Sequence, residues 1–249
     1  NGRLPQYLGD VIIRGLIAAC SVIPFAFRGK LMGHILKSII APLSGYKKRA
    51  IDNLTYIYPQ MGGAEKKRIA DAVAVNAGRT FIENYDILTL KKMLKNCEIK
   101  GEGLVALEMA HESGKPVLFV TGHFGNFEAP RAALVAKGYQ IGGLYRPMSN
   151  PYFNDHYSKN MHRLSGPVFE QGRRGTMGLL RHLKTGGMGV LLFDIYDSKG
   201  TQIPFLGKPA PTVTSAAEIA LKTGAVLIPM FGLRREDRRL FDIILKAPI

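Results

Sequence analysis

The alternation of apolar and polar positions divides the chain into an N-terminal region of long apolar runs and a longer region of short strands and helices. Short apolar runs of the type found in buried parallel strands cover 117–120, 140–145, 167–170, 190–193, 226–231 and 239–245. Helical spacing covers 104–111, 129–136, 152–164, 177–183 and 214–222. The alternation predicts an α/β fold with a single open sheet, mixed but mainly parallel, flanked by helices.

The N-terminal apolar runs, 11–27 and 31–43, are interrupted by basic residues, a histidine and a proline. A membrane-spanning helix needs about 20 apolar residues with few charges, and neither run meets that requirement fully. An amphipathic helix or hairpin lying in the membrane interface fits the pattern better. Ordinary helices that cover a protein core are the alternative, and whether 11–27 spans a bilayer or lies on it stays open.

Helical patterns continue over 47–59 and 64–88, and no linker or internal repeat interrupts the chain. We therefore expect two parts, membrane-anchoring or interfacial helices over 1–46 and one α/β domain over 47–249.

The charge is strongly basic and unevenly placed. The net charge is +15, and the first fifty residues hold eight basic side chains against one acidic side chain, Asp10. Such a surface attracts anions, which include nucleic acids, acidic proteins, phosphorylated small molecules and anionic bilayers. A basic segment interleaved with Ile, Leu, Val and Phe is a poor ladder for phosphates, and no zinc-finger, RNP or KH pattern occurs. The charge therefore favours an anionic membrane over nucleic acid.

The residues with the clearest chemistry follow the strand predicted at 117–120. The sequence GHFGNFE runs from Gly122 to Glu128, and loops at the carboxyl ends of strands are the usual ligand sites of open α/β sheets. A turn at Gly125 and Asn126 would bring the Glu128 carboxylate to one imidazole nitrogen of His123. The other nitrogen would then face a substrate hydroxyl and act as a general base.

Other catalytic arrangements lack their motifs. The two cysteines match no zinc, haem or disulfide pattern, and the histidines form no HExxH pair, so we expect no metal. No G-x-S-x-G, Walker A or strand-linked G-x-G-x-x-G occurs, which argues against a serine nucleophile and a nucleotide cofactor.

Several ordered blocks along the chain resemble one family. GHFGNFE resembles the H-x4-D/E block of the lysophospholipid acyltransferase superfamily, in the version of the bacterial lipid A late acyltransferases, the lauroyl and myristoyl transferases. The blocks that follow it in the order of that family are Tyr145-Arg146-Pro147 with Asn150-Pro151-Tyr152, then Arg163, Asp194, Ile203 to Gly207, and Leu227-Ile228-Pro229. Phe127 and Leu206 stand where the family often has Trp and Phe. The family's chains usually run somewhat beyond Ile249, so a C-terminal contribution to the acceptor pocket stays open.

The resemblance implies transfer of a fatty acyl chain from acyl carrier protein, or acyl-CoA, to a hydroxyl of a lipid A precursor at the cytoplasmic face of the inner membrane, without a metal or other cofactor. His123 and Glu128 would be catalytic. Arg146 and Arg163 would bind phosphates, with surface salt bridges as the alternative, and Asp194 would orient one of the arginines or cap a strand. Backbone N–H groups near Gly125 and Asn126 would hold the oxyanion. Phe205, Gly207 and Pro229 would shape the pocket wall.

Two other functions stay open on the sequence. The acceptor would be a lysophospholipid, glycerol phosphate or aminolipid in one of them. In the other, the chain would be a non-catalytic lipid-binding protein of the membrane.

Overall fold

The structure is a computed structural model in which residues 3–235 and 241–249 are described. It divides into two compact units. The first unit comprises residues up to Ile13, Ile87–Thr201 and Pro211–Ile249, and the second comprises Arg14–Asp86 and Gln202–Ala210. The compact units therefore do not follow the boundary expected at residue 47, because the two helices after it group with the N-terminal helices.

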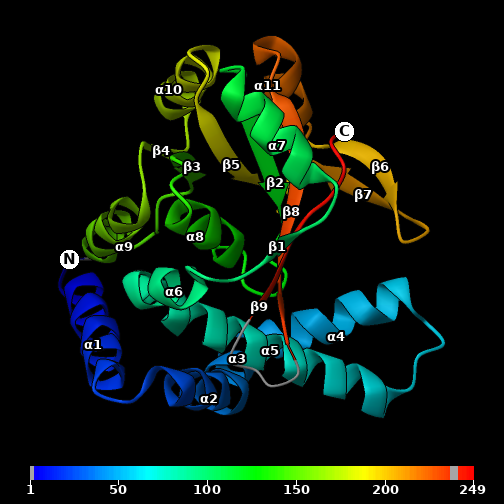
Figure 1. The fold of residues 1–249 in the computed structure, drawn as a ribbon. Coiled ribbons are helices and arrows are strands. Elements are labelled where there is room, and N and C mark those ends of the chain that lie inside the picture. The colour runs from blue at the N-terminus through cyan, green and yellow to red at the C-terminus, as the bar shows by residue number, and fades with distance from the viewer. Residues whose placement is uncertain (1–2, 236–240) are drawn as a thin grey trace. The chain divides into compact units, whose positions relative to one another are not determined.

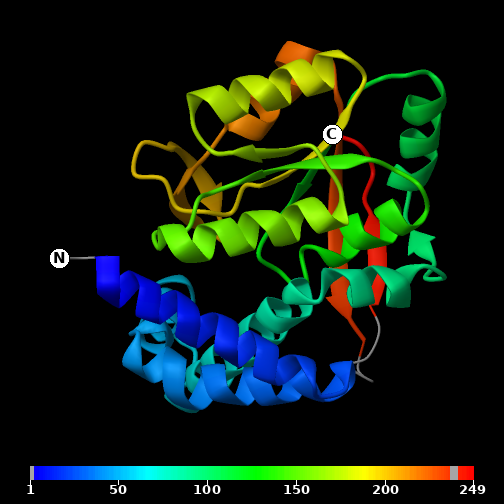
Figure 2. The same ribbon diagram turned by 90° about the vertical axis from the view of Figure 1, so that its left-hand side faces the viewer.

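A seven-stranded sheet forms the centre of the first unit (Figures 1 and 2). Its strands are β1 (Ile99–Lys100), β2 (Val117–Thr121), β3 (Ile141–Tyr145), β4 (Val168–Glu170), β5 (Met188–Leu192), β8 (Val226–Arg234) and β9 (Phe241–Leu245). They lie in the order β1-β9-β8-β2-β5-β3-β4, and every pairing is parallel except β8 with β9. This confirms the predicted mixed, mainly parallel α/β sheet. Residues 239 and 240 of the last predicted strand lie outside the described residues.

Helices cover both faces of this sheet. They are α6 (Ile87–Leu94), α7 (Gly103–Glu112), α8 (Ala129–Ala136), α9 (Pro151–Leu164), α10 (Arg173–Lys184) and α11 (Ser215–Thr223). On one face, strand residues Leu118 and Leu191 pack with Leu179 and Leu183 of α10 and with α11. Successive strand residues point to opposite faces. Gly143, a neighbour in β3 of the core residue Leu144, accordingly lies against Arg131 of α8 and Met161 of α9 on the other face.

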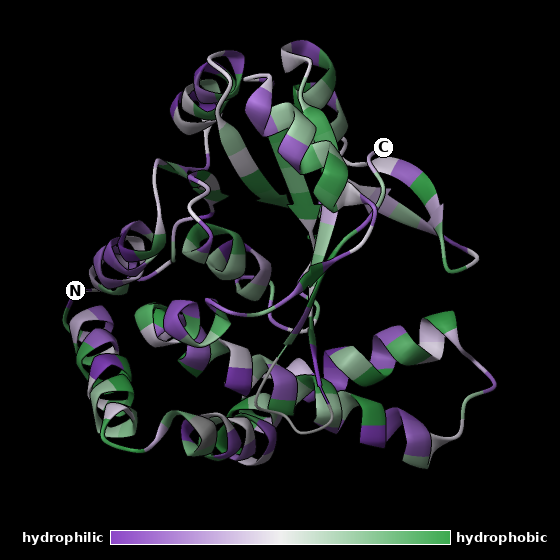
Figure 3. Ribbon diagram, in the orientation of Figure 1, coloured by the Kyte–Doolittle hydropathy of each residue, from purple (hydrophilic) through white to green (hydrophobic). Residues whose placement is uncertain are grey.

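The strands β2 and β5 lie almost wholly inside the protein, which matches their apolar sequences. Every residue of β2 is buried, and Figure 3 draws this strand in the hydrophobic colour. A parallel strand covered on both faces reads as a continuous apolar run, so the sequence predicts these strands well.

The second unit is mainly helical. It holds α2 (Phe25–Ile35), a π-helical turn (Leu36–Ile40), α3 (Ala41–Leu43), α4 (Tyr46–Ile57) and α5 (Gly63–Tyr85), together with the part of α1 (Arg3–Ser21) that begins at Arg14. Helices α2 and α5 cross closely, since a Cβ on Gly78 would lie 2.5 Å from the Met32 carbonyl oxygen. The helix predicted over 64–88 ends instead at Tyr85. The next residue, Asp86, leaves the helical conformation, and its carboxylate accepts a hydrogen bond from Arg28 Nη1 at 2.5 Å.

A two-stranded sheet, β6 (Thr201–Phe205) with β7 (Lys208–Thr212), is the element that the prediction of a single sheet lacks. Leu206 and Gly207 join the strands with positive φ values of 52° and 74°. Positive φ at both central residues is the requirement of a tight hairpin turn, which explains the glycine.

The N-terminal helix α1 keeps apolar side chains on its surface. Leu4, Tyr7, Leu8, Val11 and Ile12 are all exposed, and they recur at helical spacing. Among the described residues, no helix combines the length and the apolar character that a membrane crossing requires.

Candidate active site

The carboxyl ends of β2 and β5 bring two polar residues together. The strands are parallel neighbours, and their register pairs Thr121 with Leu192. His123 and Asp194 each stand two residues beyond this pair. The sheet register therefore places the two side chains opposite each other, although 71 positions separate them in the chain.

Two hydrogen bonds join His123 to Asp194. Imidazole Nδ1 lies 2.9 Å from Asp194 Oδ1, and the backbone N–H of His123 donates to Oδ2 at 2.6 Å. Gly122 permits this approach, because a Cβ there would lie 2.9 Å from Oδ2. Both carboxylate oxygens therefore fix the histidine, one through its ring and one through its backbone.

The electrostatics of the pair favour an ionised Asp194. Burial raises the pKa of Asp194, but the side-chain and backbone hydrogen bonds from His123 outweigh burial and hold the pKa below its ordinary value of 3.8. An ionised carboxylate accepts hydrogen bonds only, so the Nδ1 nitrogen carries the proton that it shares with Oδ1. The lone pair then lies on Nε2, for which no hydrogen bond is found among the described residues. The imidazole side chain is 50% exposed, and the Phe127 ring packs edge-on against it.

Glu128 lies elsewhere than the sequence predicts. Its carboxylate Oε2 pairs with Arg131 Nη1 at 3.4 Å, and its backbone N–H donates to Asn126 Oδ1 at 3.0 Å. Glu128 stands at the start of α8, so a residue three positions later on the same helix is its natural neighbour. The expected contact between the Glu128 carboxylate and the imidazole is therefore corrected: Asp194 takes that place.

Arg131 connects Glu128 to the body of the sheet. Its side chain is 1% exposed. Besides Glu128, it donates from Nε to the Ile141 carbonyl at 3.1 Å and from Nη2 to the Ser165 carbonyl at 2.9 Å. Burial, together with the nearby Glu128 charge, raises the pKa of Tyr157 to about 12. Glu128 and Arg131 form a largely buried ion pair at the start of α8, the helix that follows the loop carrying His123.

The turn at Gly125 and Asn126 is held by β8. The Asn126 backbone N–H donates to the Gly232 carbonyl at 3.0 Å, and Asn126 itself is fully buried. Gly125 has φ 58°, and a Cβ there would lie 2.0 Å from the same Gly232 oxygen. Only glycine fits this position. The predicted oxyanion role is corrected for Asn126, because its N–H already has a partner.

The two candidate arginines lie at opposite edges of the sheet. Arg146 directly follows β3 and is exposed at the carboxyl edge, one strand beyond Asp194. Arg163 ends α9, which is 14 residues or about 20 Å long. The next residues return to the amino end of β3, where the Ile141 N–H donates to Ser165 Oγ. Arg163 is therefore remote from His123, and Asp194 binds His123 instead of either arginine.

The three residues expected in the pocket wall fall in different units: Pro229 in the first, Phe205 and Gly207 in the second. Pro229 pairs with Val120, one residue before the end of β2, where β8 passes from its pairing with β2 to its pairing with β9. Phe205 and Gly207 end and turn the two-stranded sheet, and Phe205 is 62% exposed. Those two residues belong to the second compact unit, and their part in a pocket stays a prediction.

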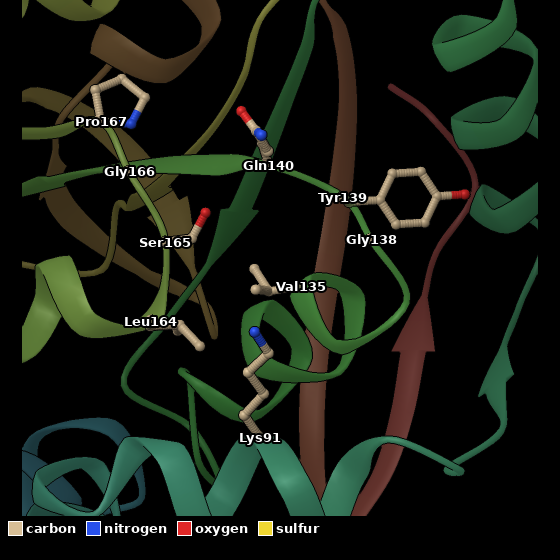
Figure 4. A pocket seen from close by; sticks show the side chains of 9 residues that line it. All are labelled: Lys91, Val135, Gly138, Tyr139, Gln140, Leu164, Ser165, Gly166 and Pro167. Atoms are coloured by element: carbon tan, nitrogen blue, oxygen red, sulfur yellow. The ribbon is translucent and has the colours of Figure 1, made fainter.

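A cavity of about 540 Å³ lies beside the starts of β3 and β4 (Figure 4). It is bounded by Gln140 and Pro167, which directly precede β3 and β4, and the Lys91 side chain extends toward it. Because β2, β3 and β4 are parallel, this is the amino edge of the sheet, whereas His123 is at the carboxyl edge. The cavity is therefore separate from the candidate site. In the part of the chain that the structure describes, no three His, Cys, Asp or Glu side chains cluster as metal ligands would.

Known proteins match most or all of the chain. A family model described as bacterial lipid A biosynthesis acyltransferase matches residues 1–249. A lipid A biosynthesis acyltransferase of Haemophilus influenzae is 26% identical over 231 residues, which cover 91% of this chain and 72% of the relative. A lipid A biosynthesis myristoyltransferase of Escherichia coli is 19% identical over 251 residues, covering 99% and 77%. A crystal structure of a 1-acyl-sn-glycerophosphate acyltransferase from Thermotoga maritima matches with a TM-score of 0.37 and 15% identity, covering 98% of this chain and 86% of that one.

Proposed function

Because the chain belongs to the bacterial lipid A biosynthesis acyltransferase family, we propose that it transfers a fatty acyl chain from acyl carrier protein to a hydroxyl of a lipid A precursor. The observation that carries this proposal, beside the family match, is the placement of the His123 imidazole. The ring stands at the carboxyl edge of the sheet, half exposed, with Nδ1 held by Asp194. Ligands of open α/β sheets bind at this edge.

The proposed reaction is a direct transfer without an acyl-enzyme. Nε2 of His123 accepts the proton of the acceptor hydroxyl as its oxygen attacks the thioester carbonyl carbon. The tetrahedral intermediate then expels the thiolate of the carrier's prosthetic group, which takes the proton back from the imidazolium. Asp194 holds the ring in the Nδ1–H tautomer and stabilises the imidazolium while it exists.

Arg146 is the proposed phosphate ligand at this edge. It is exposed beside the end of β3, and no ion pair or hydrogen bond engages it within the described residues. A planar guanidinium suits the phosphate of a lipid acceptor or of the carrier's prosthetic group. Arg163, at the other edge, is left out of this role.

We also propose that the N-terminal region holds the protein at the cytoplasmic face of the inner membrane. Exposed apolar side chains on α1 and the excess of basic residues in the first fifty positions support an interfacial position. The double replacement Leu8→Asp with Ile12→Asp is expected to weaken binding to vesicles containing anionic lipid by more than about tenfold. Sedimentation with vesicles measures this, and Leu221→Asp, an exposed leucine on α11, is the control. Equal binding of all three proteins would contradict the interfacial role of α1.

Mass spectrometry of lipid A tests the function. A strain that lacks the gene is expected to produce lipid A without one secondary acyl chain. The wild-type gene restores the chain and His123→Ala does not. Unchanged lipid A with altered phospholipids or aminolipids would contradict the proposed acceptor. Unchanged lipids of every class, together with no acyl transfer by the purified protein, would contradict the enzyme.

A further inference from the structure

Helix α10 presents an exposed face made of cations. Arg174, Arg181 and Lys184 recur at helical spacing along it, and Arg173 flanks them. All four side chains are exposed, and the helix carries no acidic residue. The opposite face is fixed in the core, since Leu179 and Leu183 are 0% exposed. The orientation of the basic face is therefore determined by packing.

In the described part of the chain, the acidic residues closest to α10, Glu170 and Glu218, form no ion pair with these cations; Glu170 accepts a hydrogen bond from the Tyr145 hydroxyl instead. Within residues 3–235 and 241–249, no ion pair or hydrogen bond engages any of the four side chains. The acidic residue of the adjoining helix α11, Glu218, is occupied by Thr214 and Lys222. Arg173 and Arg174 also stand in the first turn of α10, where the helix dipole is already positive and a cation is unfavourable. An anionic partner would relieve both conditions.

The composition of this face favours a protein partner over a bilayer. Met177, 44% exposed, is the single large apolar side chain that α10 exposes. A helix that binds a membrane interface buries a broad apolar face, as α1 has and α10 lacks. A row of cations around one methionine instead complements an acidic helix with a small apolar contact.

The start of α10 lies at the same edge of the sheet as His123. Gln171, which precedes the helix, donates its N–H to the Tyr145 carbonyl at the end of β3, next to Arg146. The strands between β2 and β4 are β5 and β3, so the start of α10 lies about 14 Å from the end of β2 along this edge. A partner seated on α10 could extend a flexible arm past Arg146 to the imidazole.

We propose that the basic face of α10 is the docking surface for the acyl carrier protein, whose acidic surface it complements and whose acyl arm then enters over the ends of β4 and β3. This proposal rests on the proposed function, because the function supplies an acidic carrier protein as the acyl donor.

The binding test uses the full chain and purified acyl carrier protein. Arg174→Glu with Arg181→Glu is expected to raise the Kd for the carrier by about tenfold or more and to reduce its salt dependence. The matched control is Lys92→Glu with Lys95→Glu, which changes the net charge by the same amount. Both lysines are exposed, one at the end of α6 and one directly after it. The control is expected to bind within about threefold of the wild type, since its charges lie away from the contact. A carrier with two acidic surface residues changed to lysine is expected to regain affinity for the α10 variant.

Three outcomes would overturn the docking surface. The α10 variant binds the carrier as the wild type does, both double variants weaken binding equally, or the α10 variant loses affinity for anionic vesicles while it keeps the carrier. Circular dichroism and thermal unfolding verify that both variants fold. The proposed function fails separately. If the carrier binds in an α10-dependent way but the wild type transfers no acyl chain, docking is supported and the transferase function is contradicted. If the wild type transfers the acyl chain but carrier binding does not depend on α10, the function is supported and the docking surface is contradicted.

Discussion

Replacing His123 with alanine is expected to slow acyl transfer by about 10²–10⁴-fold, the usual contribution of a general base. The side chain is half exposed, so its removal creates no core cavity, and Asp194 stays partly hydrated. We therefore expect the thermal unfolding temperature to change little. Steady-state transfer from acylated carrier protein, measured beside circular dichroism, checks both expectations.

A second exposed histidine, His162, provides the control for the His123 variant. His162 is an exposed histidine of α9 whose ring lies 2.8 Å from the Ser158 carbonyl, away from the carboxyl edge of the sheet. His162→Ala is expected to retain the wild-type rate within a factor of about two, since nothing reacts there. Loss of activity in both variants, or retention in both, would contradict a base at His123.

The lowered pKa of Asp194 makes the free energy of unfolding depend on pH through the His123–Asp194 pair. The folded-state pKa is lowered from 3.8, so the folded protein binds this proton less tightly than the unfolded chain does. The stabilisation is therefore complete above pH 3.8 and is lost as the pH falls through the lower folded-state value. Below about pH 4, wild type is expected to lose stability more steeply than Asp194→Asn, which cannot titrate. Urea unfolding at several pH values measures this, and parallel profiles would contradict the hydrogen-bonded pair.

Replacing Glu128 with alanine is expected to destabilise the protein by about 3 kcal/mol, because it leaves the buried Arg131 guanidinium without its carboxylate. For a chain of this size, that loss lowers the unfolding temperature by roughly 6–12 °C. Thermal unfolding measures it. Activity is expected to fall mainly through the smaller folded fraction, since Asp194 and not Glu128 contacts the imidazole.

The control for Glu128 is a surface pair with the same geometry. Glu65 and Arg68 are also three positions apart on a helix and 3.5 Å apart, but their side chains are 56% and 71% exposed. Glu65→Ala is expected to cost less than about 0.5 kcal/mol. If Glu128→Ala kept the wild-type unfolding temperature and still lost acyl transfer, Glu128 would act on the imidazole as the sequence alone predicts.

Hydrophobic periodicity predicts the α/β unit closely because its strands are buried on both faces. The helix expected over 129–136 is found at those residues, and the strand expected over 117–120 is one residue longer. The short β1 and the ribbon β6–β7 escape this signal, since two residues carry no period and β6 is exposed throughout. The end of α5 before Asp86 is not predicted, because the Asp86 carboxylate is held by Arg28, 58 positions earlier, and a local sequence pattern does not report such a distant contact.

The partner of His123 depends on strand order, and periodicity does not report strand order. Glu128 is near in sequence and its spacing suggests a dyad, whereas Asp194 becomes a neighbour only because β5 lies beside β2 in register. The available signal is that both residues stand just beyond a predicted strand end. Arg163 lies at the opposite edge from Arg146 because α9 runs back antiparallel to the strands and ends beside the start of β3.

The central proposal is that His123 is the general base and that Asp194, and not Glu128, supports its imidazole. Its most direct test is the turnover number of two isosteric variants, each normalised to its folded fraction. Asp194→Asn is expected to lose about 10²–10⁴-fold, because an amide supports neither the Nδ1–H tautomer nor the imidazolium. Glu128→Gln, which keeps an oxygen for Arg131, is expected to stay within about tenfold of the wild type. The reverse order of the two variants would contradict the account.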